Sequence, residues 1–174
     1  MKPIEINGKD EVIPIVFVGD VGHIVGGDRK EIRWWQVNDG EEVGKPMDAG
    51  DEVRSIATSW DGKWIISGTR SGQVAVWNAE SRKKVSEFKG HNKAVYAVDI
   101  SPDATKIASG SDDRTVRVWS CSSGKEFLGP WRHDSDVAAV KFSPNGQFIA
   151  TAMLAHTSQK LQRPGFAIDT NIYN

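Results

Sequence analysis

Short stretches of alternating apolar and polar residues, separated by turn sequences, recur along the chain. They are clearest in residues 94–131, where AVYAVDI and TVRVWS alternate, IASG is apolar and GKEFLGP adds a fourth stretch. Alternation with a period of two is typical of strands that bury one face, whereas a helical unit would need apolar positions at a period of about 3.6. The pattern therefore predicts four short antiparallel strands in this segment.

The same unit recurs at a fixed interval along the sequence. The strand-like stretches IRWW, VAVW and VRVW end at Trp35, Trp77 and Trp119, so the step is 42 positions each time. The turn sequences SWDG, SPDA and SPNG keep this interval, as do the pairs GH at 90–91 and RH at 132–133. Three independent markers in one register indicate a structural repeat, with one four-stranded sheet in each unit.

The sequence markers of this unit resemble those of a known family. A Gly-His pair, a Ser-Pro-Asp turn, a Ser-Asp-Asp-Arg-Thr turn and a strand ending in Trp-Ser, at this constant period, resemble the WD-repeat family. In style the units resemble the multi-repeat WD proteins of fungi. The resemblance covers roughly residues 2–152 and is most specific at 90–131. It implies an all-β fold, a partial β-propeller of about three and a half four-stranded blades.

The resemblance also suggests how the chain is divided. We expect a propeller fragment over residues 1–152, and its blades follow the repeat, at about 12–47, 52–89, 94–131 and 136–152. In the family an N-terminal strand commonly completes the last blade and so clasps the ring. KPIEI at residues 2–6 is similar to KPMDA in the outer strand of blade 1, which makes it a candidate clasp.

Blade 4 loses the repeat after its second strand. One repeat step after Asp113, Val116, Val118 and Trp119, the chain holds Ala155, Ser158, Lys160 and Leu161. Residues 153–174 are therefore predicted to be a divergent tail, and the strand at 147–152 an unpaired edge. Either the loose alternation in GFAIDTNIY acts as a substitute third strand, or the coding sequence leaves the repeat through truncation, splicing or a gene-model error. We favour the second explanation.

Composition and charge narrow the classes of partner and cofactor. The 22 Lys and Arg residues nearly balance the 23 Asp and Glu residues. The net charge therefore favours neither nucleic acid nor a membrane surface as a binding partner. Cys121 is the single cysteine, which excludes an internal disulfide and a cysteine-based metal site. The sequence has no glycine-rich phosphate loop, signal peptide or bilayer-spanning apolar run. We expect no cofactor and a cytoplasmic or nuclear location.

Blade 3 contains the residue types of a serine hydrolase site. A base that activates a hydroxyl, together with a carboxylate that orients the base, would be His91, Ser109 and Asp113. In the WD-repeat family the same positions, together with the Trp at 119, form a hydrogen-bonded structural tetrad inside the blade. We favour this structural role, because four buried polar groups that satisfy one another avoid the free-energy cost of unpaired burial.

The other blades carry the tetrad incompletely. Blade 2 keeps Ser67 and Trp77 but has Ala49 and Ser71 at the His and Asp positions; blade 4 has His133 and Thr151 but Ala155 and Leu161; blade 1 keeps Trp35. Blade 3 is therefore predicted to be the most stable blade, and the two ends of the chain the least stable parts.

The family resemblance implies a non-catalytic scaffold that binds protein partners, of unknown identity, on the top face of the ring. The matching positions are Glu52, Arg54 and Arg70 in blade 2, Ala94, Tyr96 and Asp112 in blade 3, and Asp136, Ala138 and Leu154 in blade 4. Tyr96, Arg54 and Arg70 are the strongest candidates, because aromatic and Arg side chains dominate interface energies.

Three other hypotheses stay open at this point. The chain could be a truncated remnant of a larger WD-repeat protein, with no specific binding of its own. It could be a hydrolase that uses Ser109 and His91. It could also self-associate through the open ends of its incomplete ring, because each terminal blade would expose an apolar face.

Overall fold

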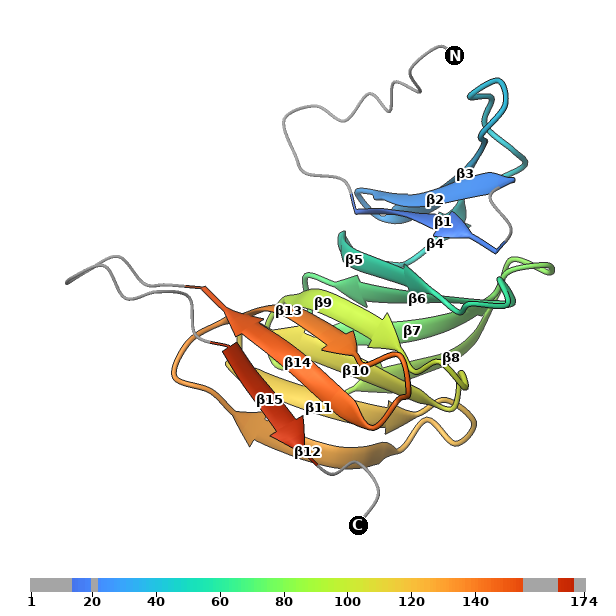
Figure 1. Cartoon of the computed structure of the whole chain (residues 1–174). Coiled ribbons are helices and arrows are strands. Elements are labelled where there is room, and N and C mark those ends of the chain that lie inside the picture. Colours follow the sequence, from blue (N-terminus) through green and yellow to red (C-terminus); the bar gives the residue numbers. More distant parts are fainter. Residues whose placement is uncertain (1–13, 20–21, 155–165, 171–174) are drawn as a thin grey trace.

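A computed structural model of the chain describes residues 14–19, 22–154 and 166–170, and within these ranges every regular element is a strand. Fifteen strands form four antiparallel sheets that follow one another along the chain. Figure 1 shows these sheets in sequence order around an open arc. No helix in the described ranges could span a membrane.

Each sheet corresponds to one repeat of the sequence. Blade 1 contains β1 (Ile15–Val18), β2 (His23–Asp28), β3 (Glu31–Gln36) and β4 (Met47–Asp48). Blade 2 contains β5 (Val53–Thr58), β6 (Trp64–Thr69), β7 (Gln73–Asn78) and β8 (Lys83–Lys89). Blade 3 contains β9 (Val95–Ile100), β10 (Lys106–Ser111), β11 (Thr115–Ser120) and β12 (Glu126–Arg132). Blade 4 contains β13 (Val137–Phe142), β14 (Phe148–Met153) and β15 (Phe166–Thr170).

The third strand of blade 4 corrects one sequence-based expectation. β15 pairs antiparallel with β14, with Ile149 opposite Asp169 and Thr151 opposite Ala167. The prediction of an unpaired edge at 147–152 is therefore wrong, because β15 occupies the hydrogen-bonding edge of β14. The pairing agrees with the explanation that we did not favour, in which GFAIDTNIY supplies a substitute strand. The candidate clasp at residues 2–6 lies outside the described residues.

The inner blades are buried on both faces. Ile65 of β6 packs in a cluster with Val25 and Ile32 of blade 1, whereas the next residue, Ile66, packs in a second cluster with Ile107 of blade 3. A third cluster joins blade 3 to blade 4. Successive side chains of a strand point to opposite faces, so each blade contributes alternate residues to two interfaces.

A glycine in each of the first three blades allows the next blade to approach closely. The valine that opens β5, β9 or β13 packs against a glycine on the second strand of the preceding blade. The pairs are Gly27 with Val53, Gly68 with Val95 and Gly110 with Val137, and a Cβ on the glycine would lie 2.5, 2.6 and 2.5 Å from the valine Cγ1, respectively. Only a residue without a side chain fits at this distance.

The strand order gives the molecule two distinct faces. The loops that enter β5, β9 and β13 lie at the same end of the sheets as the β6–β7 and β10–β11 turns, and we call this end the top face. The opposite end, where the β5–β6, β9–β10 and β13–β14 turns lie, is the bottom face. The predicted tetrad and partner-binding residues belong to the top face.

Candidate functional site

The structure brings the four predicted tetrad residues of blade 3 together. The Nδ1 atom of His91 lies 2.9 Å from Oδ2 of Asp113, and its Nε2 atom lies 2.8 Å from Oγ of Ser109. The indole N–H of Trp119 donates to the same Ser109 oxygen at 2.8 Å. Thr115, which the sequence analysis did not single out, donates from Oγ1 to Oδ1 of Asp113 at 2.6 Å.

A neutral His91 satisfies all of these contacts at once. The Asp113 carboxylate can only accept, so Nδ1 of His91 carries the proton, and Nε2 accepts from the Ser109 hydroxyl. Burial lowers the pKa of His91, and the nearby charge of Asp113 does not compensate for this. Burial alone would raise the pKa of Asp113, but hydrogen bonds from Thr115 and His91 outweigh it and hold that pKa below its usual value.

This arrangement is inaccessible from solvent. The side chains of His91 and Ser109 are fully buried, and the indole of Trp119 covers the set from the side of blade 2, where it stacks on Phe88 at 5.6 Å between ring centroids. A substrate carbonyl cannot reach the Ser109 hydroxyl without displacing these groups. The arrangement therefore links the top loop, the second strand and the third strand of one blade.

Blade 2 uses a different set of partners at the same place. The Ser67 hydroxyl accepts from the Trp77 indole at 2.9 Å, as the sequence predicts. Asp51, in the loop before β5, accepts from the backbone N–H of Ser71 at 2.7 Å. In blade 2, therefore, a carboxylate in the loop before the first strand accepts from the β6–β7 turn. In blade 3 the direction is reversed, because the carboxylate of Asp113 in the β10–β11 turn accepts from the loop. Sequence analysis missed Asp51 because it lies outside the tetrad register.

Blade 4 keeps a partial set. Thr151 is buried at the position of Ser109, and His133 occupies the position of His91. The Nε2 atom of His133 is buried and has no hydrogen-bond partner among the described residues. The corresponding Asp and Trp positions, Ala155 and Leu161, lie outside the described residues.

The predicted partner-binding residues lie in adjacent pairs along the top face. In each of blades 2, 3 and 4 the turn residue donates its backbone N–H to the carbonyl of the loop residue. The pairs are Arg70 with Glu52 at 2.8 Å, Asp112 with Ala94 at 3.0 Å and Leu154 with Asp136 at 2.9 Å. The repeat therefore places equivalent side chains of three blades at the same level.

Charged groups on this face are already paired in blade 2. Glu52 lies 2.5 Å from Arg54 through Oε1 and 3.1 Å from Arg70 through Oε2. Its carboxylate is largely buried, while the Arg70 guanidinium is mostly exposed. Glu52 therefore orients the two guanidinium groups, and Arg70 remains accessible to a partner.

Blade 3 adds an aromatic side chain and a carboxylate to the face. Tyr96 on β9 is 39% exposed, whereas its strand neighbours Val95 and Ala97 are buried. Burial raises the pKa of Asp112, and the neighbouring Asp136 carboxyl raises it further. The face thus combines guanidinium groups, a phenol ring and a carboxyl pair, and mixed surfaces of this kind are suited to protein contacts.

We predict that the complete tetrad stabilises its blade more than the partial set does. His91→Ala leaves a buried hydroxyl and a buried carboxylate unpaired, so we expect it to lower the free energy of unfolding by roughly 1–3 kcal/mol. His133→Ala is the matched change, and it should have a smaller effect because its Nε2 atom has no described partner. Urea unfolding of both variants measures the difference, and equal losses would contradict the prediction.

We also predict that the tetrad makes the stability of the fold depend on pH. The folded pKa of His91 lies below its ordinary value of 6.5, so the unfolded chain takes up a proton first as the pH falls. Stability should therefore decrease below about pH 6.5, by at most about 1.4 kcal/mol per pH unit for one proton. Asp113, with a pKa held below 3.8, should add a second loss in stronger acid. Urea midpoints between pH 7.5 and 5 should change less in His91→Ala than in the wild type, and an identical slope would refute this contribution.

Comparison with known proteins identifies the family that the sequence resembles, the WD-repeat family. The WD domain, G-beta repeat family matches residues 44–78, 82–120 and 126–157, which together make up more than half of the chain. The solved RRP9 WD40 repeats superpose with a TM-score of 0.74 and 26% identity, over 84% of this chain and 46% of that one. The structure of U3-55K gives a TM-score of 0.73 and 26% identity, over 84% and 47%.

Two curated relatives match over shorter segments. Nuclear distribution protein nudF of Aspergillus niger is 33% identical over 64 residues, which are 37% of this chain and 14% of the relative. U3 small nucleolar RNA-interacting protein 2 of Homo sapiens is 40% identical over 52 residues, 30% of this chain and 11% of the relative. The chain thus matches less than half the length of these relatives and of the solved structures. The chain belongs to the WD-repeat family, and its four sheets are blades of an all-β partial propeller.

Proposed function

We propose that the chain is a non-catalytic scaffold that binds a protein partner on its top face. WD-repeat proteins are generally interaction scaffolds, and the observation that carries the proposal is the continuous top face of blades 2 to 4. There Arg70 and Tyr96 are accessible on neighbouring blades, while Glu52 holds the Arg70 side chain in place. Aromatic and Arg side chains in such positions supply most of the energy at protein interfaces.

The tetrad supports a structural role for His91 and Ser109 rather than a catalytic one. Each polar atom of the set has a partner, and the Ser109 hydroxyl is fully buried. A nucleophile must instead reach a substrate and face donors for the developing oxyanion. A serine-reactive fluorophosphonate probe should therefore leave the folded chain unlabelled, whereas labelling at Ser109 would favour the hydrolase.

We propose a protein rather than a nucleic acid as the partner, in the cytoplasm or the nucleus. The formal net charge of −1 supports this choice, since nucleic-acid binding relies on an excess of cations. One curated relative is named for its interaction with U3 small nucleolar RNA. The binding test below therefore uses an extract treated with nuclease, which separates direct protein binding from binding through RNA.

Self-association through the ends of the arc is a second candidate. On β1 the side chains of Ile15 and Phe17 are 57% and 55% exposed, on the blade 1 face that points away from blade 2. Phe148 on β14 is exposed on the corresponding outer face of blade 4. At each of the three internal interfaces, one face of a blade packs against the opposite face of the next blade. The exposed faces of blades 1 and 4 form such a pair, so they can pack against each other between two chains.

We predict that top-face variants lose partner capture without losing stability. Tyr96→Ala and Arg70→Ala should each reduce capture from a nuclease-treated extract at least tenfold, because they remove the exposed ring and the exposed guanidinium group of the face. Lys125→Ala, an exposed change on the β11–β12 turn, is the control and should capture as the wild type does. If no protein distinguishes the wild type from Tyr96→Ala, the chain is better described as a remnant without specific binding.

We also predict that the chain self-associates as its concentration rises. Sedimentation velocity over a hundredfold concentration range should show an increasing sedimentation coefficient, driven by burial of the exposed apolar end face. Ile15→Ser should weaken this association, whereas Val85→Ser, which is equally exposed at 57% on the outer strand β8, should not. A monomer that is independent of concentration would contradict the proposal.

A further inference from the structure

The bottom face contains a cavity to which all four blades contribute. Its volume is about 660 Å³, within the range of small-molecule pockets. The lower ends of the inner strands β1, β5, β9 and β13, together with the turns that follow three of them, form its walls. The cavity lies opposite the top face, so it is separate from the partner surface proposed above.

Trp60 is the unusual residue of this cavity. It stands at the position that Pro102 and Pro144 occupy one and two repeats later, in blades 3 and 4. All three turns have the same backbone hydrogen bond, from residue 62, 104 or 146 to the Ser that opens the turn. The turn therefore does not need a tryptophan, yet Trp60 is 92% exposed at the rim. The exposed indole and two proline rings form an apolar surface without a described partner.

The hydroxyl groups that line the cavity are already engaged. Ser59, Ser101 and Ser143 each donate to the Asp or Asn two residues later, at 2.6, 2.5 and 2.7 Å. Each of them also accepts the backbone N–H five residues later. Thr58 donates to the carbonyl of Phe17 at 2.9 Å. These groups are not available as specific polar contacts, so the walls act mainly as apolar surface.

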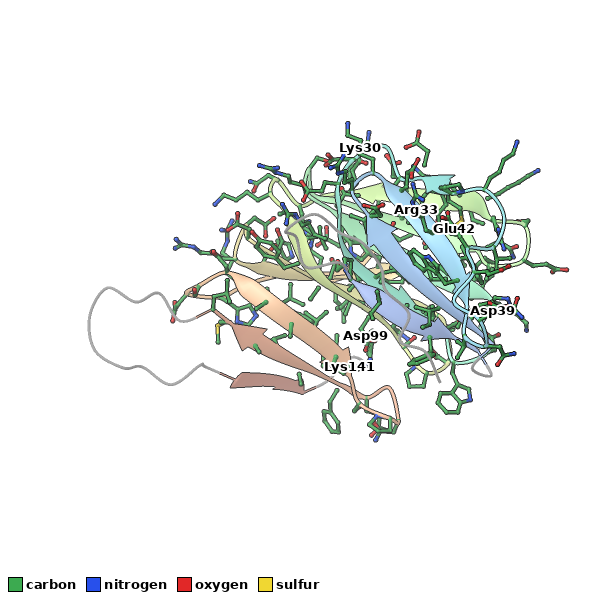
Figure 2. The ribbon with its side chains drawn as sticks, turned by 90° about the horizontal axis from the view of Figure 1, so that it is seen from above. Lys30, Arg33, Asp39, Glu42, Asp99 and Lys141 are labelled. Atoms are coloured by element: carbon green, nitrogen blue, oxygen red, sulfur yellow. The ribbon has the colours of Figure 1, made fainter. Side chains whose placement is uncertain are left out.

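Lys141 supplies the accessible charge. Among the described lining residues the formal charges are those of Asp99 and Lys141, which lie close together on neighbouring inner strands (Figure 2). Asp99 is buried and accepts from Lys141 Nζ at 2.7 Å and from the Phe142 N–H at 2.7 Å, so both of its oxygens are occupied. The Lys141 side chain is 77% exposed, and an ammonium group has three donors, of which Asp99 uses one.

We propose that this bottom-face cavity binds an extended peptide segment with a bulky apolar side chain next to an acidic one. Trp60 contacts the apolar side chain, and Lys141 donates to the carboxylate. Lys141 and Asp99 cancel in net charge, so the acidic side chain is assigned from hydrogen bonding: the ammonium group keeps two accessible N–H donors, whereas both oxygens of Asp99 are occupied. The proposal rests on the scaffold function but assigns a second surface and the chemistry of its ligand.

The test is fluorescence anisotropy with a labelled peptide, Gly-Asp-Leu-Phe-Asp-Gly, and its twin with asparagines in place of the aspartates. The protein is used at a concentration at which sedimentation shows a single species. The acidic peptide should bind about threefold to fivefold more tightly than its twin, which is the effect of one partly exposed ion pair. Added salt should reduce this preference. Equal affinity of the two peptides, or no binding at millimolar concentration, would overturn the proposal.

Variants assign the contacts. Trp60→Pro introduces the residue that blades 3 and 4 have at this position, so it should keep the turn. It should weaken binding of the acidic peptide at least tenfold. Lys141→Arg should keep the preference for the acidic peptide, and Lys141→Met should lose it. Lys89→Met, a change at a lysine of similar exposure on β8, should have no effect. Unchanged binding by Trp60→Pro would refute the site. Tyr96→Ala should bind the peptide normally, so failure here can be distinguished from failure of the top-face proposal.

Discussion

The structure depends on the close contact of each blade with the next. A four-stranded sheet that is apolar on both faces cannot be stable alone in water, and here blades 2 and 3 are covered on both sides. The contact is closest where an inner-strand valine meets a glycine, as at Gly68 and Val95 or Gly110 and Val137. These glycines set the distance at which the apolar clusters interlock, and they do so once at each of the three interfaces between blades.

The functional surfaces follow from this stacking. Because the blades stack in one register, residues one repeat apart come to the same level of adjacent sheets. On the top face this aligns Arg70 with Asp112, and on the bottom face it aligns Trp60 with Pro102. The tetrad contributes in a different way, since the bonds of His91 connect a top loop to two strands of its own blade. Packing between blades thus positions the surfaces, and hydrogen bonding within blade 3 fixes one of the loops.

Much of this could be predicted from the sequence because the repeat is regular. The spacing of Trp77 and Trp119 predicted the blades, and the spacing of Ser109 and Asp113 located the tetrad. The roles of Asp51 and Thr115 were missed, since a short carboxylate or hydroxyl can bond several nearby groups and the sequence does not select among them. The pairing of β15 was not favoured either, because a strand-length segment with weak alternation carries little register information. The exposure of Trp60 depends on the tertiary arrangement of four blades, which no local pattern reports.

The most direct test of the account is the stability of glycine variants at the blade interfaces. In Gly68→Ala and Gly110→Ala the new methyl group would meet a valine of the next blade, and such overpacking costs about 1–3 kcal/mol in urea unfolding. Gly22→Ala is the control, because a Cβ there meets no atom of the described residues within 4 Å. The account predicts a large loss in both interface variants, and no loss or a small gain in the control. Equal stability of the three variants would contradict the central role of blade-to-blade contact.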